Sequence, residues 1–468
     1  MNVADSKWFP AVTGTFAVLA MISTPPATVA APTNSATTST QQHAPADLAR
    51  PLSLADALNT ALQQSAAILK AKSDLESTYG LVVQTRAIAL PKLTVGGSFT
   101  HTDPGAIENF GSFPQPNQSW NAGFKIIQSV YEGGRLGAAI RAARLTKEQA
   151  LLQYQTVVAD TLLATRAAYY DVLLAAQQIV VNEASVALLG KELEDQRHRY
   201  DAGTVPRFNV LRAEVSVANQ RPALIRARND HRIAKNNLAN LLGYDLPRDV
   251  WENIPLQLTD TLTAEPYQVD LPSAIARALE QRTELGALRK AEKLQDENLK
   301  NARAGYQPSA QIFVGYGWRN VQFTHPVVLD HAISGWNAGA QLNWDIFDGF
   351  LTKGKVGQAR AQREKSRIEL DDTSRQVELQ VRTAYSIFIE AREVLDSQEK
   401  VQEQAEEALR LARARADAGT GTQLDVLNAE TLLTQSRTTR IVALHDYSVA
   451  RARLERAIGQ DVTDKSGM

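Results

Sequence analysis

The second half of this chain repeats the first, and this duplication limits the possible folds more than any other feature of the sequence. The motif Trp-Asn-Ala-Gly at 120–123 returns at 336–339, an offset of 216 residues (336 − 120). The motif Asp-Ala-Gly-Thr at 201–204 returns at 417–420 with the same offset. Other matches at an offset of 216 or 217 residues are 54–58 with 271–275, Pro91 with Pro308, 131–134 with 347–350, 210–214 with 426–430, and Gly243 with Gly459. The chain is therefore a tandem duplication, and we expect two copies of one structural unit.

Each copy predicts the order helix, strand, loop, strand, long helix, tight turn, helix. We place the first repeat at 51–243 and the second at 271–459, with a C-terminal tail at 460–468. The connector at 244–270 contains Pro247, Pro255 and Pro266, which predicts irregular or mixed structure between the copies.

The N-terminal 30 residues have the pattern of a secretory signal peptide, with a charged start, an apolar centre at 8–22 and a small-residue cleavage site ending at Ala30. A membrane anchor is the alternative, but Pro10 and Gly14 interrupt the apolar run, which is also short for a span. Residues 31–50, rich in Thr, Ser, Ala and Gln, are expected to form a disordered tether. The later chain has no run of 18 consecutive apolar residues, so we expect an exported protein without a transmembrane helix.

Both copies contain an unusually long uninterrupted helical segment. Residues 138–202 include no Pro and only Gly190, and residues 358–418 include neither Pro nor Gly. Apolar residues in the second segment follow the alternating spacing of a coiled-coil seam: Val377, Val381, Ala384, Phe388, Ala391 and Leu395. At 1.5 Å per residue each helix would run for roughly 90–100 Å. Each ends at a Gly-Thr pair, so we expect two equivalent antiparallel helical hairpins.

Four short segments, at 93–100, 120–127, 311–318 and 336–345, alternate apolar and polar residues. Such alternation over about ten residues is typical of outer-membrane strands. Trp120, Trp318, Trp336 and Trp344 lie in these segments, mostly near their ends, as aromatic residues at a membrane interface do. The alternative is a pair of half-buried soluble hairpins with tryptophan in the core. Because four strands cannot close a barrel and lipid does not tolerate an open sheet edge, membrane insertion requires several chains.

The duplicated plan, the prolines before the strands and the two Gly-Thr hairpin tips resemble the TolC-like outer-membrane efflux protein family over nearly the whole mature chain. The resemblance implies a mainly α-helical fold with a small β part. It also implies a homotrimer whose chains each give four strands to one 12-stranded outer-membrane barrel, continued by a long α-helical tunnel in the periplasm. The implied partners are a periplasmic adaptor (membrane fusion) protein, an inner-membrane transporter of the RND, ABC or MFS class, and outer-membrane lipid.

The resemblance also assigns roles to residues at the tips. Gly203, Thr204, Gly419 and Thr420 correspond to the tips that dock the adaptor. A periplasmic constriction corresponds to Asp425, Asn428 and Asn209, where only Asp425 keeps the family's acidic character. An inter-subunit arginine lock of some relatives falls on Gly421 and Asn209, so that lock is absent. The alternative for Asp425 is a solvated helix acid.

Other function classes are disfavoured by composition and motifs. A net charge of −1 argues against a nucleic-acid binder, and the absence of Cys excludes disulfides and Cys-based metal sites. A phosphate-loop-like motif at 349–355 is followed by Val356, which lacks the hydroxyl that binds magnesium. No nucleophile stands beside a base, so we expect no enzyme and no cofactor. Pro222 is expected to kink or locally break the return helix of the first copy.

The sequence therefore predicts the exit duct of a tripartite efflux or type I secretion system in the outer membrane of a Gram-negative bacterium. The duct would be passive, and a partner pump would drive small molecules or polypeptides through it. The alternative is a periplasmic coiled-coil adaptor or scaffold that never enters the membrane.

Overall fold

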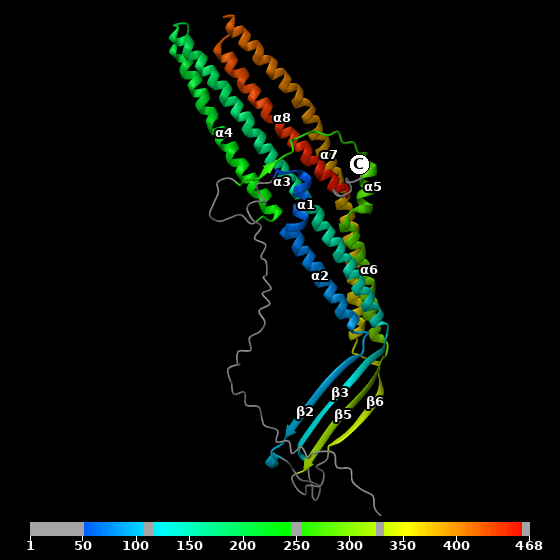
Figure 1. The fold of residues 1–468 in the computed structure, drawn as a ribbon. Helices are drawn as coiled ribbons and strands as arrows, with labels where there is room; N and C mark the ends of the chain where they lie inside the picture. The colour runs from blue at the N-terminus through cyan, green and yellow to red at the C-terminus, as the bar shows by residue number, and fades with distance from the viewer. Residues whose placement is uncertain (1–50, 107–115, 245–253, 324–331, 461–468) are drawn as a thin grey trace, which may run out of the picture. The chain divides into compact units, whose positions relative to one another are not determined.

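A computed structural model describes residues 51–106, 116–244, 254–323 and 332–460 of the chain (Figure 1). Each repeat has two shorter helices, two long strands and a hairpin of long helices. The first repeat contains β1 (Pro51–Leu52), α1 (Leu54–Gln64), α2 (Ala66–Ala87), β2 (Lys92–His101), η1 (Pro104–Ala106), β3 (Pro116–Glu132), α3 (Arg135–Asp201) and α4 (Arg207–Leu242). After β4 (Gln257–Leu258), the second contains α5 (Leu271–Gln281), α6 (Thr283–Arg303), η2 (Ala304–Tyr306), β5 (Ser309–Phe323), β6 (Ile333–Asn343), α7 (Leu351–Asp417) and α8 (Gln423–Ile458).

The two repeats are equivalent in length and in backbone conformation, which confirms the duplication. Helices α3 and α7 both have 67 residues, and α4 and α8 both have 36. Both hairpin tips carry glycine in the left-handed conformation, with φ of 73° at Gly203 and 72° at Gly419. The ends of the return helices match as well, with φ of 79° at Gly243 and 82° at Gly459. The predicted long helices are also confirmed, although α3 and α7 begin earlier than expected, at Arg135 and Leu351.

One position keeps the backbone conformation but changes from glycine to a large residue. Gly134 has a φ of 85°, whereas its counterpart Phe350 has a φ of 68°, in the region that normally favours glycine. A left-handed conformation costs a residue with a side chain on the order of 1 kcal/mol or more. The Phe350 ring packs edge-on against Phe347 at 5.5 Å, and Lys353 Nζ lies 5.5 Å from its centre.

The strands form one antiparallel sheet in the order β2-β3-β5-β6, so the two copies join edge to edge between β3 and β5. Its register pairs Val95 with Phe124, Phe124 with Tyr316, and Tyr316 with Trp336. Because side chains alternate along a strand, these partners share one apolar face. The opposite face carries small and polar residues, including Ser98, Asn121, Gln311, Asn337, Gly339 and Gln341.

No described element covers the apolar face. Val95 is 82% exposed, Leu342 68% and Trp336 76%. Tryptophan in a soluble core would be buried, so the alternative of half-buried soluble hairpins is wrong. One detail differs from expectation: β6 ends at Asn343, so Trp344 lies just past the strand, and its indole N–H donates to the carbonyl of Tyr306 at 3.2 Å.

The buried apolar residues lie along the helices in both repeats, and the repeats differ in which elements pack against them. The predicted seam of α7 is buried at Val377, Val381, Phe388, Ala391 and Leu395, against α8 and α5. The corresponding cluster of the first repeat includes Tyr169, Val172 and Leu238 and reaches Leu256 in the connector. A parallel pair between β1 and β4 fixes the start of the first repeat to the connector.

Helix α3 contains an 18-residue window with a mean hydropathy of 1.6, which meets the length and composition of a membrane span. The same test is met by helices that pack against other helices. Helix α3 packs against α4, α6 and α8. These contacts bury 28% of the apolar window.

The expected local break at Pro222 does not occur, because α4 runs without interruption through this residue. Proline removes the hydrogen bond to the carbonyl of Ala218, and both residues are exposed. Water can therefore satisfy the freed carbonyl, and the helix continues.

We predict that the two faces of the sheet respond differently to the same charge. Ala338→Arg, in the middle of β6 on the apolar face, should reduce stability by about 2–4 kcal/mol if that face contacts lipid. Asn337→Arg, on the polar face, is the matched control and should change stability by less than about 1 kcal/mol. Denaturation in lipid bilayers measures both variants, and equal effects would contradict the assignment of the faces.

Candidate functional site

The two hairpin tips share one turn geometry. The N–H groups of Gly203 and Thr204 donate to the carbonyls of Tyr200 and Arg199, both at 2.9 Å. The Thr204 hydroxyl also donates to the carbonyl of Arg199, at 2.8 Å. In the second copy Gly419 and Thr420 donate to Ala416 and Arg415 in the same way. Both turns are exposed, and no atom lies within 4 Å of where a side chain on either glycine would begin.

Asp425 has a structural role at the second tip. Its N–H donates to the Thr422 hydroxyl at 3.2 Å, and its carboxylate accepts from the Thr422 N–H at 2.9 Å. The two residues form a capping box at the start of α8. The hydrogen bonds from Thr422 hold the pKa of Asp425 below its ordinary value. The carboxyl group is exposed and ionised at neutral pH.

At the first tip, the return helix α4 begins without the side-chain cap that α8 has. Pro206 precedes α4 and forms no side-chain cap. Asn209, expected at the constriction, is half-buried, and its carbonyl accepts from Gln423 Nε2 of the other hairpin at 3.1 Å. Asn428 is exposed on α8. Of the three constriction residues, the structure therefore leaves Asp425 and Asn428 exposed and uses the Asn209 backbone to join the hairpins.

A second link between the tips was missed by the sequence reasoning. Arg199 Nη2 of α3 lies 3.0 Å from Asp417 Oδ1 of α7, and Arg199 Nε lies 2.8 Å from Asp195. The Arg199–Asp417 ion pair joins the two hairpins next to the turns that both copies share. When the two copies are aligned, Asp417 corresponds to Asp201. An ion pair between the copies, however, produces no recurring spacing within either copy from which it could be predicted.

Polar side chains also join α3 to α8 along their length. Ser185 meets Thr434 at 3.0 Å, and Asp171 meets His445 Nε2 at 2.8 Å. Burial alone would lower the pKa of His445, but Asp171 and Asp446 together outweigh it and raise the pKa. Charged His445 therefore strengthens the contact between the hairpins.

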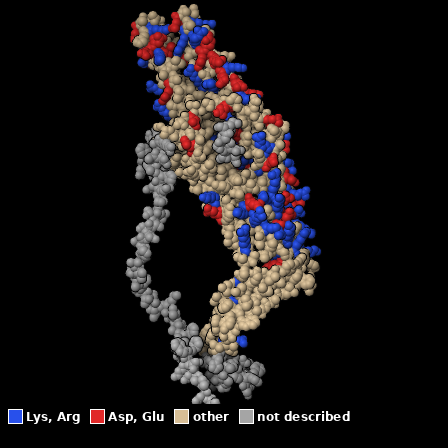
Figure 2. Space-filling model, turned by 45° about the vertical axis from the view of Figure 1, so that its right-hand side comes forward, with Lys and Arg blue, Asp and Glu red and all other residues tan. Residues whose placement is uncertain are grey.

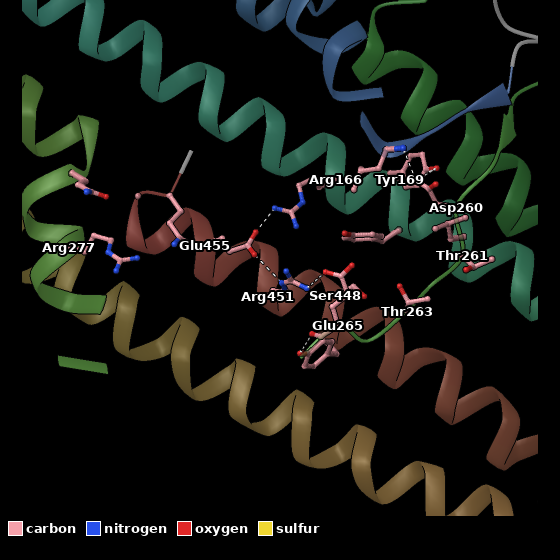
Figure 3. Close-up of a pocket in the computed structure, with 17 residues that line it drawn as sticks. Arg166, Tyr169, Asp260, Thr261, Thr263, Glu265, Arg277, Ser448, Arg451 and Glu455 are labelled. Carbon is pink, nitrogen blue, oxygen red and sulfur yellow. Dashed lines mark hydrogen bonds and ion pairs between the residues drawn. The ribbon is translucent and has the colours of Figure 1, made fainter. Parts of the chain in front are cut away.

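A cavity of about 1040 Å³ lies where the two repeats meet at the connector (Figure 3). A chain of charges crosses it: Arg166 Nη1 lies 2.7 Å from Glu455, Arg451 Nε lies 3.0 Å from Glu455, and Arg451 Nη1 lies 3.0 Å from Glu265. The side chains of Arg166 and Glu455 are only 10% and 7% exposed. On the other wall, the Tyr169 hydroxyl donates to Asp260 and to the carbonyl of Leu52.

This arrangement is suited to holding the repeats together. The carboxylates of Glu455, Glu265 and Asp260 are each engaged by an arginine or a hydroxyl, so none is placed as a base beside a nucleophile. Among the described residues there is no group of three His, Asp or Glu side chains that could hold a metal ion.

The comparisons with known proteins agree with this geometry. A family model described as "Outer membrane efflux protein" matches twice, at residues 57–244 and 274–460. The chain belongs to the outer membrane efflux protein family. Outer membrane protein TolC of Vibrio cholerae serotype O1 is 25% identical over 423 residues, which cover 88% of this chain and 92% of that protein. Outer membrane efflux protein BepC of Brucella suis is 32% identical over 193 residues, 40% of each chain.

Solved structures show the same fold. The outer membrane protein VceC of Vibrio cholerae superposes with a TM-score of 0.73 at 20% identity, covering 87% of this chain and 96% of that one. The protein is thus an outer-membrane efflux channel, with strands for a barrel in the membrane and a helical tunnel in the periplasm. Its family is one of channels rather than enzymes, and the scaffold alternative is wrong.

We predict that the ion pairs in the cavity contribute strongly to stability only at their buried end, at Arg166 and Glu455. Glu455→Gln removes the carboxylate that buried Arg166 pairs with and leaves Arg451 with Glu265 alone, and it should destabilise the protein by about 3 kcal/mol or more. Glu265→Gln removes the exposed end, where Glu265 is 72% exposed, and should cost less than about 1 kcal/mol. Chemical denaturation of both variants measures the difference. Similar costs would show that burial does not determine the strength of this network.

Proposed function

We propose that this chain forms a homotrimeric exit duct through which a partner pump expels its cargo without covalent chemistry in the duct. The observation that carries the proposal is the sheet: four strands with an uncovered apolar face and two unpaired edges, β2 and β6. Lipid does not satisfy the free N–H and C=O groups of an edge, so neighbouring chains must pair with both edges. Three chains give the 12 strands that the family resemblance implies.

The rest of the assembly is proposed from the same plan. The chain would divide into a signal peptide at 1–30, a tether at 31–50, repeats at 51–243 and 271–459, a connector at 244–270 and a tail at 460–468. The residues before 51 and after 460 lie outside the described part of the chain. The Gly203-Thr204 and Gly419-Thr420 tips would dock a periplasmic adaptor, which links the duct to an inner-membrane transporter. Their exposure and rigid turns support this role. Trp120, Trp318, Trp336 and Trp344 would lie at the membrane interfaces.

The oligomeric state is the first test. We expect protein extracted by detergent from a separated outer-membrane fraction to have the native mass of a trimer. A monomer, or protein released without detergent, would contradict the proposal, because the two sheet edges would then have no partner in lipid.

We also propose that Asp425 from three chains forms a cation-attracting ring at the periplasmic end, since a ring of carboxylates favours cations in a narrow pore. Asp425→Asn should reduce the cation preference of single channels in planar bilayers. Because Asp425 also caps α8, Thr422→Ala is the matched control: it removes the cap hydroxyl and keeps the charge. A Thr422→Ala channel with the same loss of preference would show that the cap, and not the charge, is responsible.

A further inference from the structure

The described helices next to the sheet carry a concentration of positive charge. Residues 293–303 of α6 and 353–367 of α7 contain nine Lys or Arg against three Asp or Glu, in a chain whose net charge is −1. Figure 2 shows Lys and Arg gathered over the helices beside the sheet, whose visible face is almost uncharged. We name six exposed residues of these segments the basic belt: Lys293, Lys300, Arg303, Lys353, Arg360 and Arg367.

The position of the belt around each helix can be read from its neighbours. A polar hollow is lined by Gln295 and Asn298 of α6, by Gln358 and Gln362 of α7, and by Ser309 and Asn343 of the sheet. Ser309 and Asn343 are paired and lie on the polar face of the sheet. The hollow therefore continues that polar face onto the helices.

The belt lies on the opposite side of the helices from this hollow. Lys293 is two positions from Gln295 and Lys300 is two positions from Asn298, which line the hollow from α6. Arg360 is two positions from Gln358 and from Gln362, which line it from α7 together with Thr352, Lys355 and Ala359. Two positions are about 200° around a helix axis. Lys353, Arg360 and Arg367 follow one another at seven-residue spacing, so they share one side of α7. The belt is therefore on the side that continues the apolar, lipid-facing surface of the sheet.

Aromatic residues mark the height of the membrane interface beside the belt. Trp344 and Tyr306 lie at the junction of strands and helices, are 57% and 52% exposed, and are joined by the indole hydrogen bond. Trp and Tyr collect at the level of lipid headgroups. Arg303 is the last residue of α6, and Lys353 is the third of α7. Lys300 is three residues further, about 4.5 Å along the axis. All three lie within about one Debye length, ~8 Å, of that junction.

We propose that the basic belt binds the headgroups of anionic phospholipids in the periplasmic leaflet of the outer membrane. Lys and Arg close to a membrane surface attract anionic lipids, and the attraction declines within a Debye length. The three acids of these segments are engaged: Asp296 pairs with Arg363, Glu297 with Arg141 and Lys300, and Glu364 with Arg367. Lys300 and Arg367 of the belt therefore each have an acidic partner, whereas the belt has six cations in all. Arg303 has no ion pair with any described residue, so its charge is available to lipid phosphate. The inference rests on the outer-membrane location and is independent of the cargo and of the trimer.

Trp344 provides the probe for a direct test. The protein, with its other tryptophans replaced by Phe, is reconstituted in phosphatidylcholine vesicles that contain either brominated phosphatidylglycerol or brominated phosphatidylcholine at the same fraction. Bromine quenches tryptophan on contact, so the ratio of the two quenching constants reports which lipid collects at the junction. We expect phosphatidylglycerol to be preferred by about threefold or more at low salt.

Two triple variants carry the comparison. The belt variant, Lys300→Gln with Arg303→Gln and Lys353→Gln, should bring the ratio close to one. The control variant, Lys125→Gln with Arg135→Gln and Lys355→Gln, removes the same charge from the polar side, where these residues line the hollows, and should keep the preference. If the belt variant does not fold, the wild-type ratio at high salt replaces it, because salt should remove the preference.

Several results would overturn the proposal. One is a ratio of quenching constants near one for the wild-type chain. Another is an equal loss of the preference for phosphatidylglycerol in the two triple variants. A third is a wild-type ratio that salt does not change. If the belt variant lost binding to isolated peptidoglycan sacculi while its lipid ratio stayed unchanged, the belt would contact the cell wall and not lipid. Because channel conductance and native mass are measured separately, a failed lipid preference would leave the duct proposal standing.

Discussion

The unpaired edges of the four-stranded sheet determine what the rest of the molecule must do. Among the described strands, β2 and β6 each pair along one edge only, and no described element covers the apolar face between them. Lipid can cover the apolar face but cannot hydrogen-bond to the backbone groups of the edges. The proposed trimer would supply strands from other chains to pair with both edges. The helices next to the sheet follow the same order as the strands, because α2 packs against α3, α3 against α6, and α6 against α7.

Duplication made most of this fold readable from sequence. Matching motifs located both tips, both long helices and four strands, since left-handed turns favour glycine and the two faces of a sheet require alternating residues. What the motifs could not show were contacts between the copies. The pairs Arg199–Asp417, His445–Asp171 and Arg166–Glu455 join helices far apart in sequence, and their residue types are common on any helix surface. The spacing of Thr422 and Asp425 is that of a capping box, but an acid at this position fits a cap and a pore equally well, so the sequence alone does not separate the two roles.

The charged side chains in the cavity at the connector have a structural role, because they join the two repeats. Buried ions are costly unless every one has a partner. Here one carboxylate, Glu455, serves two arginines from α3 and α8, and Glu265 of the connector completes the chain. Glu284 is held in the same way by Arg282 and Arg456, which lower its pKa to about 2 although burial alone would raise it. The result is an ionic joint that fixes two hairpins to each other far from both the tips and the sheet.

The two repeats have the same backbone fold and the same turn at the tip, but their return helices begin with different residues. The second tip begins its return helix with the hydroxyl and carboxylate of Thr422 and Asp425, whereas the first begins with Pro206, which offers no side-chain cap. In the proposed trimer, a ring of these hairpins would contain six hairpins of two alternating kinds. A partner that touched every hairpin would meet two different surfaces in turn, and it would need two kinds of binding element or two binding poses. Divergence at a few cap residues after the duplication would then determine how many copies of a partner each kind of surface binds.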